Sequence, residues 1–194
     1  MLNNNPIIQF QNWFEDAKND RDIIHPNAMT LSTIGLDGYP DSRIVLLKAL
    51  DEQGFSFFTN YNSIKGQQLA QSMRGGLLFF WEKLGRQVRV QGNIESATEA
   101  ESDSYFASRP RLSQVGACVS AQSQELTSKI ALEKAVEEFE ASYHQQPIPR
   151  PSHWGGYRLI PHKIEFWIER PYRLHDRFEY TKVNSEWLIR RLAP

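Results

Sequence analysis

Residues 28–50, AMTLSTIGLDGYPDSRIVLLKAL, decide the fold. Two runs rich in β-branched and aliphatic residues flank Asp37-Gly38, a dipeptide that is typical of a tight turn. This pattern predicts two antiparallel strands, AMTLSTIG and SRIVLLKAL, joined by that turn. A second turn around DEQG leads into FSFFTN, so the three runs together indicate a meander.

More segments of the same kind follow along the chain. Strands are predicted at GLLFFWE, RQVRVQGNI, WGGYRLI, KIEFWIE, RFEYT and SEWLIRRL. Strands this numerous, with short turns between them, indicate a closed or nearly closed antiparallel barrel, because closure removes exposed edges. The predicted class is mainly β with flanking helices, in a single domain over residues 1–194.

Helices are predicted beside these strands. Apolar residues at helical spacing over residues 7–17 indicate an opening helix within an N-terminal segment of residues 1–20. Ser63 is a typical N-cap for a helix over IKGQQLAQS. A later helix, at about residues 126–143, has an apolar stripe that should pack on the barrel and consists of Leu132, Val136, Phe139 and Tyr143.

A further helix is predicted between the middle and the last strands. Thr98 begins a capping-box pattern, and the helix should stop near Pro110. Such a helix would place Tyr105 and Arg109, four residues apart, on one face. The Pro- and Gly-rich stretch QQPIPRPSHWGG, from Gln145, predicts an ordered connection to the final strands.

The composition excludes several classes of function. A net charge of −1 gives no overall electrostatic attraction for nucleic acid or an acidic membrane surface. The single Cys118 excludes an internal disulfide framework and any multi-cysteine metal site. The first 20 residues lack a basic region followed by an apolar run, so we expect a cytoplasmic protein with small-molecule partners.

Familiar catalytic motifs are missing from the sequence. There is no GxSxG elbow and no glycine-rich phosphate loop, so hydrolase and nucleotide-fold interpretations lack their usual parts. No metal site is predicted, because no HxxxH pair and no cysteine pair accompanies the five histidines, which are His25, His144, His153, His162 and His175.

Four segments instead offer groups that bind anions. They are SRIVLLK with Arg43 and Lys48, SIK with Ser63 and Lys65, YFASRPRLS with Tyr105, Arg109 and Ser113, and RLHDR at residues 173–177. Helix N-terminal amides, Arg, Lys and hydroxyl groups all donate to phosphate oxygens, so the set indicates one or two phosphate sites. Taken singly, each segment is better explained as ordinary solvated surface, and only the set together favours an anion site.

The alternation of side chains along a strand leads to two specific predictions for these segments. If RLHDR is extended, Arg173, His175 and Arg177 share one face, as a solvated strand or as a wall of an anion site. Arg43 and Lys48 are five residues apart, so one regular strand turns them to opposite sides. A bulge or a twist is then needed to bring both to one ligand.

In their order and spacing, several blocks resemble the pyridoxine/pyridoxamine 5′-phosphate oxidase family. They are RIVLLK, FFTNYNSIKG, RQVRVQG, YFASRPRLSQVGA, QS at 122–123, HWGGYR, IEFW, RLHDRF and RLAP. The resemblance covers nearly the whole chain from about Phe10, and SRPRLSQ and RLHDRF are long enough to be specific. It implies a split β-barrel that binds FMN, and a homodimer with FMN in clefts at the interface. Residues 154–194 would form the dimerisation and substrate-binding strands.

The resemblance also implies the residues of the site. FMN would contact Arg43, Ile44, Val45, Leu46, Leu47, Lys48, Phe58, Thr59, Ile64, Lys65, Gln87, Gln122, Ser123, Trp167 and Arg177. Substrate would contact Lys48, Tyr105, Arg109, Ser113, Arg173, Leu174 and His175. The catalytic pair would be Arg173, which stabilises developing charge, and His175, which orients the ring.

The implied reaction belongs to vitamin B6 metabolism. Pyridoxine or pyridoxamine 5′-phosphate would be oxidised to pyridoxal 5′-phosphate by hydride transfer from C4′ to flavin N5, with O2 as acceptor and H2O2 as product. The amine substrate would also release ammonia. The sequence departs from the family at Ile64, where a basic residue is usual, so one contact to the FMN phosphate is missing.

Three other interpretations stay open at this point. A related flavin oxidase of secondary metabolism would act on a larger aromatic substrate, although SRPRLS and RLHDR argue against it. A non-catalytic carrier of flavin or pyridoxal phosphate is conceivable because of Ile64. A plain structural barrel would leave the four donor segments unexplained.

Overall fold

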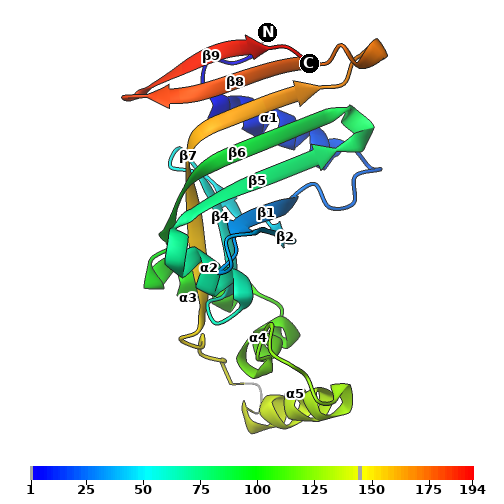
Figure 1. The fold of residues 1–194 in the computed structure, drawn as a ribbon. Helices are drawn as coiled ribbons and strands as arrows, with labels where there is room; N and C mark the ends of the chain where they lie inside the picture. Colours follow the sequence, from blue (N-terminus) through cyan, green and yellow to red (C-terminus); the bar gives the residue numbers. More distant parts are fainter. Residues whose placement is uncertain (1, 144–145) are drawn as a thin grey trace.

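The computed structural model describes residues 2–143 and 146–194. Its main feature is an antiparallel sheet of nine strands in the described residues, ordered β2-β1-β5-β6-β7-β4-β3, with β8 paired to β7 and β9 to β8 (Figure 1). The strands are β1 Ala28–Ile34, β2 Pro40–Leu46, β3 Ala49–Leu50, β4 Phe55–Asn60, β5 Arg74–Trp81, β6 Arg86–Ser96, β7 Trp154–Ile168, β8 Asp176–Val183 and β9 Glu186–Leu192. The predicted antiparallel, mainly β class is confirmed.

The turn between β1 and β2 has the backbone conformation and the hydrogen bond that its Asp37-Gly38 sequence predicts. Gly38 has a φ of 86°, a conformation that glycine adopts without strain, and the Asp37 carboxylate accepts a hydrogen bond from the Tyr39 N–H. The pairing of β1 with β2 begins directly at this turn, with Ile34 opposite Pro40. The hairpin therefore follows from local sequence.

The run SRIVLLKAL differs from the prediction of one strand. β2 ends at Leu46, and β3 begins only at Ala49. Leu47 turns into the core, where it is 4% exposed, and Lys48 is exposed. Because the chain leaves the regular strand at these two residues, the alternation between Arg43 and Lys48 does not continue.

Five helices in the described residues accompany the sheet. They are α1 Pro6–Asn19, α2 Ile64–Ser72, α3 Glu99–Ser108, α4 Arg111–Val119 and α5 Lys129–Tyr143. The predicted caps are confirmed: the Ser63 hydroxyl accepts from the Gly66 N–H, and Thr98 forms a full capping box with Glu101. No helix among the described residues is both long and apolar enough to cross a membrane.

Two hydrophobic clusters hold these elements together. In the larger cluster, α1 covers the sheet, and Phe10 makes edge contacts with Phe55 and Phe79. The smaller cluster centres on Phe106, Val115, Ile148 and Trp154. The prediction that the stripe of α5 packs on the barrel is wrong, because Val136, Phe139 and Tyr143 pack against this smaller cluster beside α4.

The segment after α3 differs from the sequence analysis in two ways. α4 was not predicted, because Pro110 marks the end of one helix and hides the start of the next. Arg109 does not continue the face of Tyr105, since it caps the end of α3 with an extended backbone. The turn after α3 instead directs the chain back over the smaller cluster.

The final strands contain two further differences. WGGYRLI and KIEFWIE form one continuous strand, β7, which pairs with β6 along most of its length. RLHDR is not extended throughout: Pro171–Arg173 form a 3₁₀ turn, Tyr172 and Arg173 have positive φ, and β8 begins only at Asp176. The three basic side chains therefore do not alternate along one strand. The start of the predicted connection, Gln145, lies outside the described residues.

Candidate functional site

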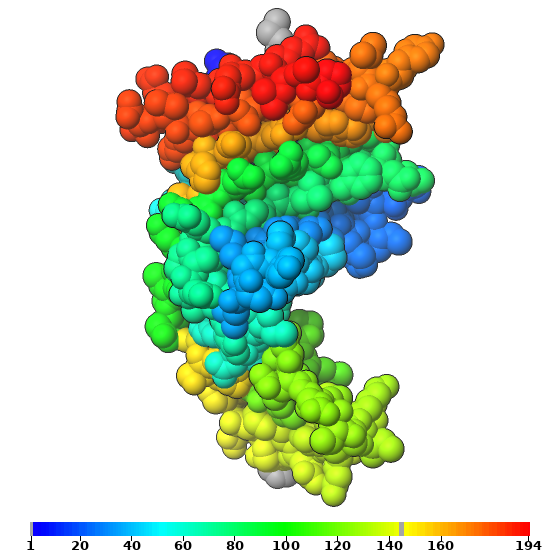
Figure 2. All heavy atoms as spheres, in the orientation of Figure 1, coloured from blue at the N-terminus to red at the C-terminus, as the bar shows by residue number. Residues whose placement is uncertain are grey.

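A cavity of about 670 Å³ lies where β2, β4 and the start of α2 face α3 and α4. Figure 2 shows the surface hollowed between the blue-to-cyan strands and the green helices. Its walls come from segments that are distant in the sequence, from Ile44 in β2 to Trp154 in β7. The tertiary fold alone creates the site.

The lining of the cavity carries positive charge without acidic partners. Lys48, Lys65 and Arg109 line it, and no Asp or Glu does so among the described residues. Elsewhere, comparable side chains are paired: Arg43 with Asp41 at 2.5 Å, and Arg150 with Glu99 and Asp103 at 2.6 Å each. Cations that lack a carboxylate favour an anionic ligand.

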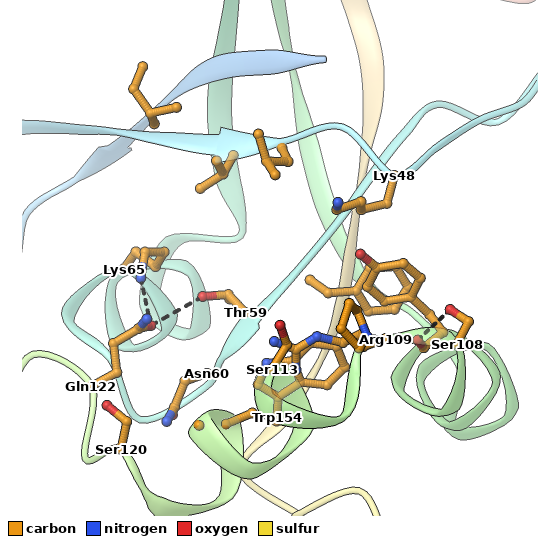
Figure 3. A pocket seen from close by; sticks show the side chains of 18 residues that line it. Lys48, Thr59, Asn60, Lys65, Ser108, Arg109, Ser113, Ser120, Gln122 and Trp154 are labelled. Atoms are coloured by element: carbon orange, nitrogen blue, oxygen red, sulfur yellow. Dashed lines mark hydrogen bonds between the residues drawn. The ribbon is translucent and has the colours of Figure 1, made fainter. Parts of the chain in front are cut away.

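One end of the cavity gathers hydrogen-bond donors around Lys65. Its Nζ donates to Gln122 Oε1 at 2.9 Å and to Ser63 Oγ at 3.2 Å, and Thr59 donates to the same carboxamide oxygen at 3.5 Å (Figure 3). Burial and the nearby Arg43 guanidinium lower the pKa of Lys65. An anion at this position would therefore be stabilised more than at an exposed lysine.

The other end of the cavity is built on stacked aromatic rings. Phe58 stacks on Tyr105 with 4.1 Å between ring centroids and on Trp154 with 5.6 Å. The Arg109 guanidinium lies 4.6 Å from the Trp154 ring centroid, and Lys48 Nζ lies 5.7 Å from the Tyr105 centroid. Ser113 of α4 lines the same region. Figure 3 shows Lys48 and Arg109 on the side of the cavity opposite Lys65.

Arg109 is the most unusual side chain of the cavity. Its Nη1 is buried and has no hydrogen-bond partner in the part of the chain that the structure describes. Burial lowers the pKa of this guanidinium, which indicates that its charge is poorly solvated. An unpartnered buried donor is costly, so the geometry favours a ligand that accepts from it.

A second group of predicted residues lies at the far end of the sheet, and we call it the distal cluster: Gln87, Trp167, His175 and Arg177. Gln87 is opposite Trp167 across β6 and β7, and Trp167 is opposite Arg177 across β7 and β8. The His175 ring lies 4.5 Å from the Trp167 ring. Neighbours in register share one face, so these side chains form a single surface.

His175 is oriented by a backbone contact. The Arg170 N–H donates to His175 Nδ1 at 3.1 Å, so this nitrogen is an acceptor and the ring carries its proton on Nε2. The Asp176 carboxylate, which also pairs with Arg170 at 2.8 Å and with Arg191, fixes the end of the turn. His175 can therefore present an N–H donor but not a free base at Nε2.

The cavity and the distal cluster are far apart within one chain. Trp154 and Trp167 lie near opposite ends of β7, and Figure 1 shows this strand running from the helices to the far edge of the sheet. Thirteen residues of extended strand correspond to roughly 40 Å. One ligand cannot contact both groups in the same chain.

Comparison with known proteins decides the family. The family described as pyridoxamine 5′-phosphate oxidase matches residues 16–143, and its C-terminal dimerisation region, described for pyridoxine 5′-phosphate oxidase, matches residues 154–194. The chain belongs to the pyridoxine/pyridoxamine 5′-phosphate oxidase family. The resemblance seen in the sequence is thereby confirmed.

Individual relatives agree with this assignment. A pyridoxine/pyridoxamine 5′-phosphate oxidase of Nostoc sp. (strain PCC 7120) is 53% identical over 98% of this chain and 89% of its own length. The corresponding protein of Acaryochloris marina is 50% identical over 100% and 88%. The crystal structure of PhzG from Burkholderia lata 383, in complex with tetrahydrophenazine-1-carboxylic acid, is 30% identical with a TM-score of 0.93, over 99% of this chain and 94% of that one.

The residues predicted from the family divide between several places. Those that line the cavity are Ile44, Val45, Leu46, Lys48, Phe58, Thr59, Lys65, Tyr105, Arg109, Ser113 and Gln122. Arg43 lies beside it but donates to Thr33 and Gln68, and Leu47 is in the core. Ile64 and Ser123 are exposed and do not line it, and Arg173 and Leu174 are exposed near the distal cluster.

Several lining residues of this family member were not predicted. They are Asn60, Ser108, Pro110, Gly116, Ala117, Ser120 and Trp154. Trp154 is both a core residue and a lining residue, since it is 6% exposed and supports Arg109. Gly116 and Ala117 belong to the unpredicted helix α4, and no sequence signal marks them.

Proposed function

We propose that the protein oxidises pyridoxine 5′-phosphate and pyridoxamine 5′-phosphate to pyridoxal 5′-phosphate with the help of FMN. The observation that carries the proposal is the cavity whose three cations have no acidic partner among the described residues. Relatives at 50% identity and more bear the name of this activity. A cationic, aromatic-lined cavity is suited to phosphorylated ring compounds.

The residues present fit FMN as the cofactor. Lys65, Gln122 and Thr59 would hold its phosphate, because the Lys65 and Thr59 donors meet only neutral oxygens, those of Gln122 and Ser63, within the described chain. Ile44 and Leu46 of β2, which are 65% and 40% exposed, offer apolar surface and strand backbone for the flat ring. When bound, FMN supplies the two-electron oxidation of the substrate's C4′ carbon and its own reoxidation by O2.

The substrate phosphate would bind at the Arg109 end of the cavity. Arg109 would donate its unpartnered Nη1, and Ser113 and Tyr105 would add hydroxyl donors. Lys48 would lie between the two phosphates, at the break between β2 and β3. These groups position the substrate, which is the protein's main contribution to the reaction.

The distal cluster would complete the site from a second copy of the chain. His175 would offer its Nε2 proton to the substrate ring, Arg173 would stabilise developing charge, and Arg177 would contact FMN. Because the cavity and this cluster are roughly 40 Å apart along β7, a homodimer explains why both sets occur in one sequence. The matched C-terminal dimerisation region supports this assembly.

The proposal is tested by an anaerobic titration of the FMN-supplemented protein with pyridoxamine 5′-phosphate. The flavin absorption should bleach, and it should recover with formation of pyridoxal 5′-phosphate when air is admitted. Unphosphorylated pyridoxamine is the matched control, and it should bleach the flavin only at far higher concentration. A flavin that binds and never bleaches would instead support a carrier or an oxidase of another aromatic substrate.

Ile64 offers a test of the FMN phosphate position. It is 49% exposed at the first residue of α2, so an arginine fits there without strain. We expect Ile64→Arg to tighten FMN binding about tenfold or more, because a charge-assisted hydrogen bond contributes roughly 1.5 to 3 kcal/mol. Ile64→Gln is the uncharged control for fluorescence titration of FMN. Equal affinity of the two variants would show that charge at this position is irrelevant.

Lys65 predicts a pH dependence of FMN binding. Since burial and Arg43 lower its pKa, its charge is lost at lower pH than that of an ordinary lysine. Deprotonation removes a cation from the phosphate, so FMN affinity should fall as the pH rises through this lowered pKa. The dissociation constant, measured from pH 7 to alkaline pH, should become less dependent on pH in Lys65→Met. An equal slope in both proteins would assign the effect to another group.

A further inference from the structure

The outer face of β6, β7, β8 and β9 carries two buried acids in direct opposition. Glu165 of β7 is 6% exposed, and its cross-strand partner Glu179 of β8 is 8% exposed. Like charges in this arrangement repel each other, so the pair is unfavourable unless cations compensate for it. The described residues around it supply four such cations: Arg89, Lys163, Arg177 and Arg190.

Each of the two acids binds two of the four cations. Glu179 binds Arg190 at 2.5 Å and Lys163 at 3.8 Å, and neither of these cations belongs to the distal cluster. Glu165 binds Arg89 at 3.3 Å and the Nε of Arg177 at 2.8 Å. Only Glu165 therefore contacts a member of the distal cluster.

Arg177 is held at two of its three nitrogens. Glu165 accepts from Nε, and the Ala193 carbonyl accepts from Nη1 at 3.0 Å. The remaining nitrogen, Nη2, forms no hydrogen bond to the described residues, and the side chain stays 28% exposed. The hydrogen bond to Glu165 raises the pKa of Arg177, which agrees with a strong contact.

We infer that Glu165 is a positioning residue, which fixes the guanidinium of Arg177 so that Nη2 is presented to FMN bound in the partner subunit's cavity. The inference rests on the proposed function, because it requires that FMN binds there. Two fixed nitrogens leave the planar guanidinium a single orientation, so little side-chain entropy is lost when the cofactor binds. The Ala193 carbonyl, which accepts from Arg177 Nη1, also helps to fix the guanidinium in this orientation.

The test compares two isosteric changes on the same face. Glu165→Gln and Glu179→Gln each remove one of two opposed buried carboxylates, but only the first changes a contact of Arg177. We expect Glu165→Gln to weaken FMN about tenfold by fluorescence titration, within the coupling range of contacting residues. Glu179→Gln should change FMN affinity less than twofold. Thermal unfolding of both variants should shift by similar amounts.

A double-mutant cycle decides whether Glu165 acts through Arg177. In an Arg177→Met background, Glu165→Gln should have no further effect on FMN affinity. Additive losses, or equal losses in Glu165→Gln and Glu179→Gln, would overturn the inference and leave a purely structural ion network. An unmodified protein that binds no FMN would overturn the proposed function and this inference together. An unmodified protein that binds FMN, with no change in Glu165→Gln, would overturn the inference alone.

Discussion

Arg109→Met is expected to raise the KM for pyridoxamine 5′-phosphate about 100-fold while leaving the protein at least as stable as the unmodified chain. The loss in binding corresponds to roughly 3 kcal/mol, the value of a strong charge-assisted hydrogen bond. Methionine keeps an apolar side chain against Trp154, so packing of the smaller cluster should be preserved.

The expected stability of the Arg109→Met variant follows from the absence of a hydrogen-bond acceptor for Arg109 in the described residues. Arg109 Nη1 is buried without an acceptor among the described residues, so the folded protein bears its desolvation cost until an anion binds. Removing the guanidinium removes that cost. The same argument predicts that phosphate-bearing ligands raise the unfolding temperature of the unmodified protein more than that of the variant.

Arg150→Met is the contrasting variant. Arg150 Nη1 also donates to the Trp154 carbonyl oxygen at 2.7 Å. Unlike Arg109, Arg150 is paired with two carboxylates, those of Glu99 and Asp103. Its loss should lower the unfolding temperature and affect the KM far less. Steady-state kinetics and thermal unfolding of the two variants are the measurements. A KM that stays unchanged in Arg109→Met would remove Arg109 from the substrate site.

A random mixture of dimers formed from two inactive variants is expected to regain about a quarter of the unmodified activity, and the purified mixed dimers about half. Arg109→Met damages the cavity, and Arg177→Met damages the distal cluster, so each variant alone should be nearly inactive at substrate concentrations near the KM of the unmodified protein. If each site combines the cavity of one subunit with the distal cluster of the other, a mixed dimer contains one intact site. Random pairing makes about half of the dimers mixed, and half of their sites are intact.

The matched control pairs two variants of the same cluster. Mixed dimers of Arg109→Met and Lys48→Met carry a damaged cavity in both subunits, so they should regain nothing. Co-expression with two different affinity tags isolates the mixed dimers before activity is measured. Purified mixed dimers without activity in the first pair would mean that each site lies within one chain.

Local signals predicted much of this structure correctly. The Asp37-Gly38 turn and the caps at Ser63 and Thr98 depend on interactions within four residues, so spacing is sufficient to identify them. Strand periodicity identified the sheet, although it could not show that Leu47 and Lys48 interrupt a strand. That break depends on the burial of Leu47 in a core made by distant segments.

Features that depend on contacts between distant residues could not be predicted from these local sequence signals. Alternation predicted a shared face for RLHDR, but the positive φ values of Tyr172 and Arg173 form a turn there. The cavity joins strands and helices from residues 44 to 154, and its Gln122 was identified by the family resemblance rather than by periodicity. The opposition of Glu165 and Glu179 depends on the register of β7 with β8, which the sequence does not reveal.

The length of strand β7 sets the distance between the cavity and the distal cluster. It is one element from Trp154, which supports the cavity, to Trp167, which belongs to the distal cluster. Inserting a single residue between them would turn every later side chain to the opposite face and displace it by about 3.3 Å. Substitutions between the two tryptophans, at residues that contact neither site, should therefore be tolerated better than a change in the residue count. Length variation should accumulate instead in connections such as the turn at Asn184 between β8 and β9.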